Sequence, residues 1–296
     1  MKRVFFIVGP TAVGKSEIAA EVARQRDAEV VSADAYQIYR GLDLLTAKPD
    51  QATRAKATHH LIGTVPLSEE MNAEKFRAAA EKIIGTARSF IVVGGTGLYI
   101  KALTHGLDRL PGANQTLRAK LEGTTNEELF RGLSSLDSQA AAKIDRQNRR
   151  RLIRAVEVCL LTGQPFSNQR ADWDHVSAAE GILLCRDRDD LYRRINERVD
   201  QMFEAGVVQE VRGTTNVGPT AEKTLGLREI RALIAGEISQ AECIARIQQA
   251  TRRYAKRQLT WFRRQTNFPS LNLSAHRPSE AIELISQNAA RVLVRG

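Results

Sequence analysis

Short, continuous apolar runs alternate with amphipathic stretches along much of this chain. Val4 to Val8 is one such run, Val30 and Val31 form a second, and Phe90 to Val93 is a third. The third run leads directly into the glycine-rich stretch Gly94 to Gly97. Because strands that are buried on both faces appear as unbroken apolar runs, this pattern predicts a parallel β-sheet covered by helices on both sides.

The same pattern predicts further strands and helices. The segment after Gly14 has apolar residues at helical spacing. Ile182 to Cys185 predicts a fourth strand, and Ser270 to Leu273 a fifth. One helix is predicted from about Asp189 to Arg212, and a long helix from about Ser239 to Gln265. Strands that alternate with helices in this way are typical of a doubly wound α/β fold.

The pattern of apolar and polar residues changes between about Asp108 and Ala179. Strand-like runs disappear there, and amphipathic helical stretches are joined by Gly, Asn, Thr and Ser. We therefore predict an α/β core formed by residues 1–108 and 180–296, with an all-helical insertion over residues 109–179. With 296 residues, the chain is long enough for one large domain or two modest ones.

The chain opens with a phosphate-binding motif. Residues 9–16 read GPTAVGKS, which matches G-x-x-x-x-G-K-[ST] between a predicted strand and a predicted helix. The two glycines allow backbone angles that direct successive N–H groups into one concavity, and the helix N-terminus adds partial positive charge. Lys15 supplies a mobile charge, and the Ser16 hydroxyl can join the ligand shell of Mg²⁺. The motif predicts a P-loop NTPase-like fold and a diphosphate or polyphosphate site formed by Gly9, Pro10, Thr11, Ala12, Val13, Gly14, Lys15 and Ser16.

A carboxylate follows the second predicted strand. In a doubly wound sheet the carboxyl ends of the strands face the ligand crevice, so we expect Asp34 to lie near the phosphate loop. A carboxylate at that place can be a Mg²⁺ ligand, a general base or a helix N-cap, and the residues alone leave all three open. The stretch Gly94 to Gly97, which contains Thr96, is expected to bring a third backbone segment to the same ligand.

Two basic segments change this picture. The net charge is +10, and much of the excess lies in Arg146 to Arg154, with five arginines, and Thr251 to Arg264, with six basic residues and no acid. In the first segment, the apolar stripe predicted to pack inward is Leu152, Ile153, Val156 and Leu160, which leaves Arg150 and Arg154 outside. In the second, the residues predicted to share one face are Arg253, Lys256, Arg257 and Arg264. A solvated surface would explain either segment, but both together favour the phosphate backbone of a nucleic acid as partner.

The cysteines and the apolar runs exclude other classes of protein. Cys159, Cys185 and Cys243 lie far apart and lack the spacing of a zinc site or a disulfide framework. We expect buried thiols in a reducing cytoplasm. Because the apolar runs fall far short of the length needed to cross a bilayer, we expect no membrane partner.

Several segments, in the same order along the chain, resemble the tRNA dimethylallyltransferases, the bacterial isopentenyl transferases that modify the adenosine immediately 3′ of the anticodon. Besides the phosphate loop, they are DAYQIYRGLDLLTAKP at 34–49, HHLI at 59–62, VGGTGLY at 93–99, RRRLIRAVEV at 149–158 and YAKRQLTWFR at 254–263. The resemblance therefore covers nearly the whole chain.

The resemblance implies a Mg²⁺-dependent transfer of a dimethylallyl group from dimethylallyl diphosphate to the N6 amine of that adenosine, with release of diphosphate. It assigns Lys15 to the departing diphosphate, Asp34 as general base, Thr96 to the base or the diphosphate, and Ser16 to the metal. It also implies binding of the anticodon stem-loop of tRNA through Asp34, Ala35, Tyr36, Gln37, Thr96, Arg118, Arg150, Arg151, Leu152, Ile153, Arg154, Lys223, Thr224, Leu225, Gly226, Leu227 and Arg228. The sequence does not determine the oligomeric state, and a monomer is the default expectation.

The chain departs from the family pattern at a few positions, and other functions remain to be weighed. Ala35 stands where Ser is usual, Leu45 where Gly is common and Leu227 where an aromatic residue is frequent. An adenylate isopentenyltransferase acting on free nucleotides would not need the insertion or the arginine clusters. A P-loop small-molecule kinase would explain the loop and Asp34 but not the basic segments. An RNA-binding module without activity would leave the phosphate loop without a role.

Overall fold

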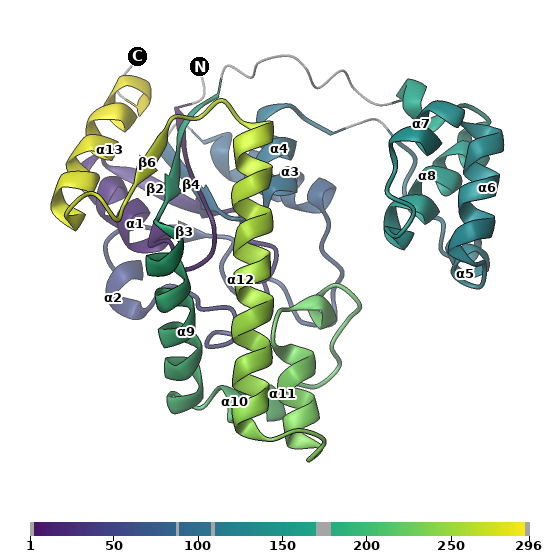
Figure 1. The fold of residues 1–296 in the computed structure, drawn as a ribbon. Helices are drawn as coiled ribbons and strands as arrows, with labels where there is room; N and C mark the ends of the chain where they lie inside the picture. Colours follow the sequence, from purple (N-terminus) through teal and green to yellow (C-terminus); the bar gives the residue numbers. More distant parts are fainter. Residues whose placement is uncertain (1–2, 87–88, 108–109, 170–178, 294–296) are drawn as a thin grey trace. The chain divides into compact units, whose positions relative to one another are not determined.

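The computed structural model describes residues 3–86, 89–107, 110–169 and 179–293 (Figure 1). The chain divides into two compact units, Met1–Thr104 with Ser177–Gly296, and His105–Val176. The sequence analysis predicts the boundaries of the helical insertion near residues 109 and 179. No helix in the described ranges is long and apolar enough to cross a membrane.

The larger unit is built on a parallel sheet, as the apolar runs predicted. Among the described residues the sheet has six strands in the order β3-β2-β4-β1-β5-β6, and every neighbouring pair is parallel. The strands are β1 (Val4–Val8), β2 (Ala28–Ser32), β3 (His59–His60), β4 (Ser89–Gly94), β5 (Glu180–Cys185) and β6 (Ser270–Asn272). The five predicted strands are confirmed, while β3 is too short to give a periodic signal.

Helices cover both faces of this sheet. The helices of the larger unit are α1 (Lys15–Gln25), α2 (Gln51–Arg54), α3 (Ala73–Ile84), α4 (Gly97–Thr104), α9 (Arg188–Glu204), α10 (Val207–Arg212), α11 (Leu227–Ile234), α12 (Gln240–Gln265) and α13 (Pro278–Leu293) in its described part. Of these, α10 and α11 pack against α9 and α12 in a separate apolar core rather than against the sheet. Successive side chains of a strand point to opposite faces. Phe5 and Ile7 of β1 therefore pack in one core with residues of α1, α9 and α13, while Phe6 and Val8 pack in another with residues of α3, α4 and α12.

The helix predicted from about Asp189 to Arg212 is wrong in one respect, because it is two helices. Helix α9 ends at Glu204, and α10 begins at Val207. Between them Gly206 has a φ of 94°, a left-handed conformation that glycine adopts without steric cost and that stops a helix. The long helix is confirmed: α12 begins at Gln240, and the Ser239 side chain caps it by accepting from the Glu242 N–H.

The smaller unit contains helices and turns in its described part. Its helices are α5 (Gln115–Glu122), α6 (Asn126–Leu136), α7 (Ser138–Lys143), α8 (Arg149–Thr162) and a 3₁₀ turn at Phe166–Gln169. Leu152, Ile153 and Val156 of α8 are buried in its apolar core, as predicted. Leu160 is not: its side chain is 51% exposed, because it lies in the last turn of α8, beyond that core.

Candidate active site

The phosphate loop joins β1 to α1 and needs its glycines. Gly9 has a φ of 154°, and a Cβ there would lie 2.5 Å from the carbonyl oxygen of Leu184 on the neighbouring strand. Gly14 has a φ of 105° and precedes the first turn of α1. The N–H groups of that first turn have no partner within the helix, so they are available to an anion. The local geometry predicted from GPTAVGKS is therefore present.

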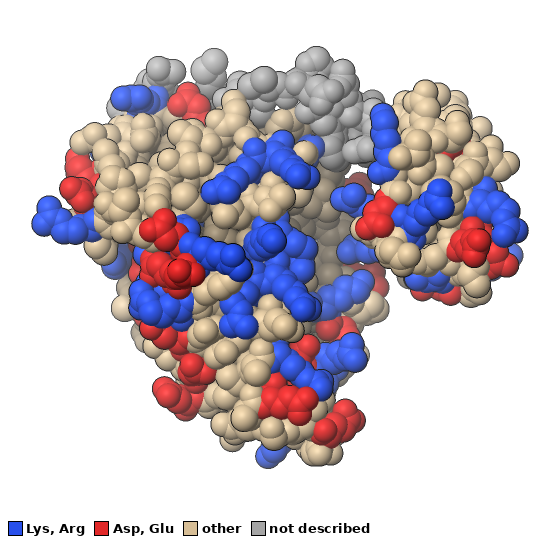
Figure 2. Space-filling model, viewed as in Figure 1, with Lys and Arg blue, Asp and Glu red and all other residues tan. Residues whose placement is uncertain are grey.

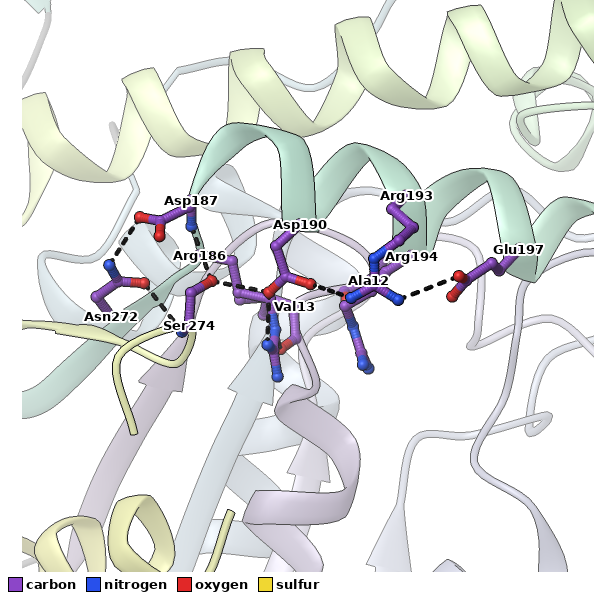
Figure 3. Close-up of polar contacts among 10 residues, drawn as sticks. All are labelled: Ala12, Val13, Arg186, Asp187, Asp190, Arg193, Arg194, Glu197, Asn272 and Ser274. Carbon is purple, nitrogen blue, oxygen red and sulfur yellow. Dashed lines mark hydrogen bonds and ion pairs between the residues drawn. The ribbon is translucent and has the colours of Figure 1, made fainter. Parts of the chain in front are cut away.

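Two arginines, one just after β5 and one in α9, donate hydrogen bonds to backbone carbonyl groups of this loop. Arg186 Nε donates to the carbonyl oxygen of Val13 at 2.9 Å, and Arg194 Nε donates to that of Ala12 at 3.0 Å (Figure 3). Ala12 has a φ of 63°, an uncommon conformation for a residue other than glycine. The two guanidinium groups thus fix the direction of two consecutive carbonyl groups in the loop.

Asp190 in turn holds Arg186. Its Oδ2 atom accepts from Arg186 Nη1 and from the Ser274 hydroxyl, each at 2.8 Å, as Figure 3 shows. Burial alone would raise the pKa of Asp190, but the hydrogen bonds from Arg186, Ser274 and Arg193 lower it to about 2. The carboxylate therefore stays ionised at any pH at which the protein works, and it keeps the Arg186 side chain in place.

The side chain of Lys15 turns back to the phosphate loop and lines the polar pocket next to it. Its Nζ atom donates to the carbonyl oxygen of Pro10 at 2.6 Å. Desolvation lowers the pKa of its ammonium group to about 7, with Asp34 acting in the opposite direction and the guanidinium of Arg198 adding to the decrease. An anion bound in the loop would restore the charge of Lys15, so the site favours a highly charged ligand such as diphosphate.

Two adjoining pockets meet at Asp34. A polar pocket is lined by Thr11, Ala12, Gly14, Lys15 and Ser16 of the phosphate loop, together with Gln37, His59 and others. A mostly apolar pocket is lined by Tyr36, Leu45, Met202, Phe203, Thr224, Leu225 and Tyr254, among others. Thr11, Asp34, Thr46, Ala47 and Arg198 border both pockets. Asp34 thus stands where a charged group and an apolar group would meet.

The backbone holds one oxygen of Asp34. Its Oδ1 atom accepts from the N–H groups of Tyr36 at 2.9 Å and of Gln37 at 3.2 Å. Residues 35–38 form a turn rather than a helix, so the carboxylate closes an Asx-type turn and is not a helix N-cap. Because these two bonds use Oδ1, the Oδ2 atom is left for a substrate proton or a cation.

Thr96 supports this turn from behind. Its hydroxyl oxygen accepts from the Ala35 N–H at 2.9 Å, and its own N–H donates to the carbonyl oxygen of Ala33 at 3.2 Å. Thr96 borders neither of the two pockets. The structure therefore places Thr96 against the backbone that carries Asp34, and its expected contact with the base or the diphosphate stays a prediction.

The structure also places at the site three residues to which the sequence analysis gives no role there. Arg198 of α9 borders both pockets, and burial together with the like charge of Arg194 lowers its pKa. Tyr254 of α12 lines the apolar pocket, and burial raises the pKa of its hydroxyl. Four residues further on, Gln258 is buried and contacts the phosphate loop. Two signals in the sequence relate to these contacts: Arg194 and Arg198 are four residues apart on one predicted helix, and Tyr254 and Gln258 belong to the segment YAKRQLTWFR at 254–263.

Several residues assigned to tRNA by resemblance have other contacts. The side chains of Leu152, Ile153 and Leu227 are buried in apolar cores, so they are corrected to structural residues. Thr224 and Leu225 line the apolar pocket, and Gly226 supplies the left-handed residue before α11, with a φ of 92°. The charged residues of these segments that stay exposed are Arg150, Arg151, Lys223 and Arg228.

Arg118 and Arg154 share a buried partner. Glu157 has no exposed side-chain surface, and its carboxylate binds Arg118 Nε at 2.9 Å, Arg154 Nη1 at 2.8 Å and the Asn114 N–H at 2.8 Å. Arg154 also donates to the carbonyl oxygen of Pro111. The expectation that Arg154 lies free on the outer face is therefore corrected, because its charge neutralises a buried carboxylate.

A row of cations lies along α12. The exposed residues of its second half include Arg253, Lys256, Arg257, Arg263 and Arg264. Figure 2 shows Lys and Arg gathered over this helix. The four residues predicted to share a face are all exposed, as a nucleic-acid surface requires.

The polar pocket has the donor set expected for Mg²⁺ bound together with a phosphate ligand. The described residues contain no cluster of three or more His, Cys, Asp or Glu side chains suited to a metal. Mg²⁺ is usually held by one or two protein oxygens, substrate phosphates and several waters, and Ser16 and Asp34 both line this pocket. His59 lines it too, and its buried Nε2 atom has no hydrogen-bond partner in the described structure, so it can accept from a water.

Comparison with known proteins gives one consistent family. The family described as IPP transferase matches residues 37–265. A tRNA dimethylallyltransferase of Akkermansia muciniphila is 42% identical over 267 residues, which span 88% of this chain and 90% of that protein. A second, from Alkaliphilus metalliredigens, is 38% identical and spans 97% of each chain.

Solved structures are similar over nearly the whole chain. The tRNA isopentenylpyrophosphate transferase of Bacillus halodurans has a TM-score of 0.73 and 34% sequence identity, covering 99% of this chain and 97% of that one. A eukaryotic dimethylallyltransferase acting on tRNA has a TM-score of 0.80 and 25% identity, covering 98% of this chain and 78% of that one. The P-loop NTPase-like α/β fold predicted from the sequence is confirmed.

Proposed function

This chain belongs to the IPP transferase family, and on that premise we propose that its prenyl donor is dimethylallyl diphosphate and its acceptor the N6 amine of the adenosine immediately 3′ of the anticodon. The chain is a transferase that prenylates tRNA, as the relatives that match most of its length do. One observation carries the assignment of the site: Asp34 borders both a polar pocket and an apolar one.

The polar pocket accounts for the leaving group. The bond between the allylic carbon and the diphosphate oxygen breaks, and the diphosphate departs with the electron pair. Lys15, Arg198 and the N–H groups at the start of α1 take up the charge that develops there. Mg²⁺ held by the Ser16 hydroxyl would supply further charge stabilisation to the departing diphosphate. The dimethylallyl group would extend toward the apolar pocket, whose walls exclude water from the allylic centre.

Asp34 accounts for the nucleophile. The exocyclic amine of adenine is weakly nucleophilic, because its lone pair is delocalised into the ring. As the new N–C bond forms, the amine must lose a proton, and Asp34 Oδ2 is the acceptor. Both backbone hydrogen bonds to this carboxylate go to Oδ1. The turn therefore fixes the orientation of the carboxylate and leaves Oδ2 to accept the proton.

The exposed Lys and Arg side chains support an RNA as the substrate, because they can bind its phosphates. The target base must leave the anticodon-loop stack, which requires a grip on the phosphates around it. The cations of α12 lie on the helix that also carries Tyr254 to the apolar pocket. Arg150 and Arg151 of the smaller unit are exposed and supply further phosphate contacts. We further propose that the enzyme acts as a monomer in the cytoplasm, where its unpaired thiols stay reduced.

The test is a direct assay of the product. Purified protein and an unmodified tRNA transcript are incubated with Mg²⁺ and either dimethylallyl diphosphate or ATP, and the digested nucleosides are analysed by mass. The proposal expects prenylated adenosine with the prenyl donor alone, and none from a transcript in which guanosine replaces the target adenosine. Prenylation of free AMP at a comparable rate, or turnover of ATP without any prenylated product, would contradict it.

A further inference from the structure

Helix α12 presents two different faces in the larger unit. One face carries exposed cations, including Arg253 and Lys256. The other face is turned inward, where Tyr254 lines the apolar pocket and Gln258 is only 6% exposed. A buried amide must have its hydrogen bonds satisfied by nearby groups. The partners of Gln258 are therefore informative.

Both ends of the Gln258 amide contact loops of the active site. Its Oε1 atom accepts from the Thr11 N–H at 2.9 Å, and its Nε2 atom donates to the carbonyl oxygen of Gly95 at 2.9 Å. A side chain at position 95 would collide with this amide, so the close approach depends on glycine there. Since both atoms of the amide are matched to a partner of the opposite kind, its orientation is fixed by the two loops.

One of the two loops binds the leaving diphosphate, and the other supports the turn that carries the general base Asp34. Thr11 lies in the phosphate loop after β1, and Gly95 follows β4, the strand next to β1 in the sheet. The residue after Gly95 is Thr96, whose hydroxyl accepts the Ala35 N–H beside Asp34. A short series of hydrogen bonds thus runs from the diphosphate side, through Gln258, to the turn that holds the carboxylate.

From this geometry we propose that Gln258 is a positioning residue, which sets the distance between the diphosphate loop and the turn that carries Asp34. The inference rests on the proposed function of these two parts. In a displacement reaction the carbon, the leaving oxygen and the amine must be held near contact distance and in line. An error of about 1 Å in such an arrangement costs about a hundredfold in rate. The amide acts on that distance without touching either substrate.

The first experiment replaces the amide by groups of similar size. Gln258→Leu keeps the volume but removes both hydrogen bonds. We expect its single-turnover rate, at saturating tRNA and donor, to fall about a hundredfold. We expect the dissociation constants for tRNA and for Mg²⁺–diphosphate, measured by calorimetry, to change by less than about threefold. A merely structural role would instead lower the melting temperature and weaken binding and rate together.

The second experiment uses Gln258→Glu, whose protonated form restores an acceptor and a donor. A buried carboxyl titrates well above its usual range. The rate of this variant, divided by that of the wild type at each pH, should therefore rise as the pH falls. At pH 8 the variant should be as slow as Gln258→Leu, because the carboxylate cannot donate to Gly95. A ratio that does not change with pH would overturn the proposal.

A glutamine elsewhere on the same helix provides the matched control. Gln248 Nε2 donates to Asp200 of α9 at 3.1 Å, away from both loops. Gln248→Leu should keep the wild-type rate. A wild type that transfers no prenyl group would contradict the proposed function. An active wild type beside an equally active Gln258→Leu would contradict the positioning role alone.

Discussion

Arg186 donates a hydrogen bond from Nε to the carbonyl oxygen of Val13, at 2.9 Å, and thereby holds the middle of the phosphate loop. The guanidinium is itself fixed by Asp190, which binds its Nη1 atom at 2.8 Å. Hydrogen bonds that involve a charged group contribute more to stability than neutral ones. The loop thus owes part of its shape to a side chain beyond the GPTAVGKS motif.

Arg186→Met should therefore weaken diphosphate binding more than it slows the chemical step. Loss of one charged hydrogen bond, about 1.5 to 3 kcal/mol, corresponds to about a tenfold or larger rise in the dissociation constant. Calorimetry with Mg²⁺–diphosphate measures the binding, and single-turnover kinetics at saturating donor measures the step. Arg193→Met is the control, because Arg193 is exposed and contacts Asp190 but not the loop. Equal effects of the two changes would contradict the expectation.

The lowered pKa of Lys15 predicts that diphosphate binding takes up protons. With a pKa of about 7 in the empty site, the ammonium is largely neutral at pH 8 and largely charged at pH 6. Bound diphosphate raises that pKa, so uptake by Lys15 should approach about one proton at pH 8 and shrink toward pH 6. Calorimetry in buffers of different ionisation enthalpy measures it. In Lys15→Arg, whose guanidinium stays charged, the pH-dependent part should be missing. Its persistence there would assign the proton to another group.

Asp34→Asn separates the chemistry from the turn. The amide oxygen of Asn can still accept from Tyr36 and Gln37, so the local backbone should be retained. The amide cannot take up the proton of the amine, and the single-turnover rate should fall about a hundredfold or more. Affinity for tRNA, measured by filter binding, should stay within about threefold of the wild type. Weak binding with an unchanged rate would show that Asp34 serves the RNA rather than the proton.

The parts of the site that are local in sequence could be predicted, and the parts made by distant contacts could not. The phosphate loop is one continuous motif between an apolar run and a helix, so Lys15 and Ser16 could be assigned directly. The partners of Gln258 lie 247 and 163 residues away in the chain, and no periodic pattern reveals them. Strand β3 has two residues, which is fewer than one repeat of the alternation that identifies a strand.

The sequence also does not show which charged side chains are free to bind a partner. Arg154 is predicted from the sequence to be a free cation, because the apolar stripe of its helix packs inward. That prediction takes no account of Glu157, three residues along. Its burial depends on how α5 and α8 pack together, which the pattern of single segments does not specify. Sequence therefore predicts that a segment is basic, but the structure decides which of its charges are available to RNA.

Glu210 gives a prediction about the wall of the apolar pocket. Its carboxylate accepts from the N–H groups of Asp43, Leu44 and Leu45, at 2.7 to 2.9 Å, and so ties that loop to α10. Glu210→Ala should release the loop and raise the KM for tRNA about tenfold, because binding must then order it. Hydrogen exchange of a peptide spanning the three amides should show reduced protection. Unchanged protection would mean that other contacts hold the loop.

The arginines of α8 should divide into two classes by what their replacement changes. Arg154→Gln removes one charged hydrogen bond from the buried Glu157, which keeps Arg118, and should destabilise the protein by about 1.5 to 3 kcal/mol in its unfolding transition. Changing Arg150 and Arg151 together to Gln should leave that transition unchanged, because both are exposed. For each phosphate that these two side chains neutralise, the change should make the dependence of log K for tRNA on log salt shallower by about 0.7 to 0.9. If the slope stays the same, the RNA does not bind this face of α8, and the cations of α12 must hold the phosphates instead.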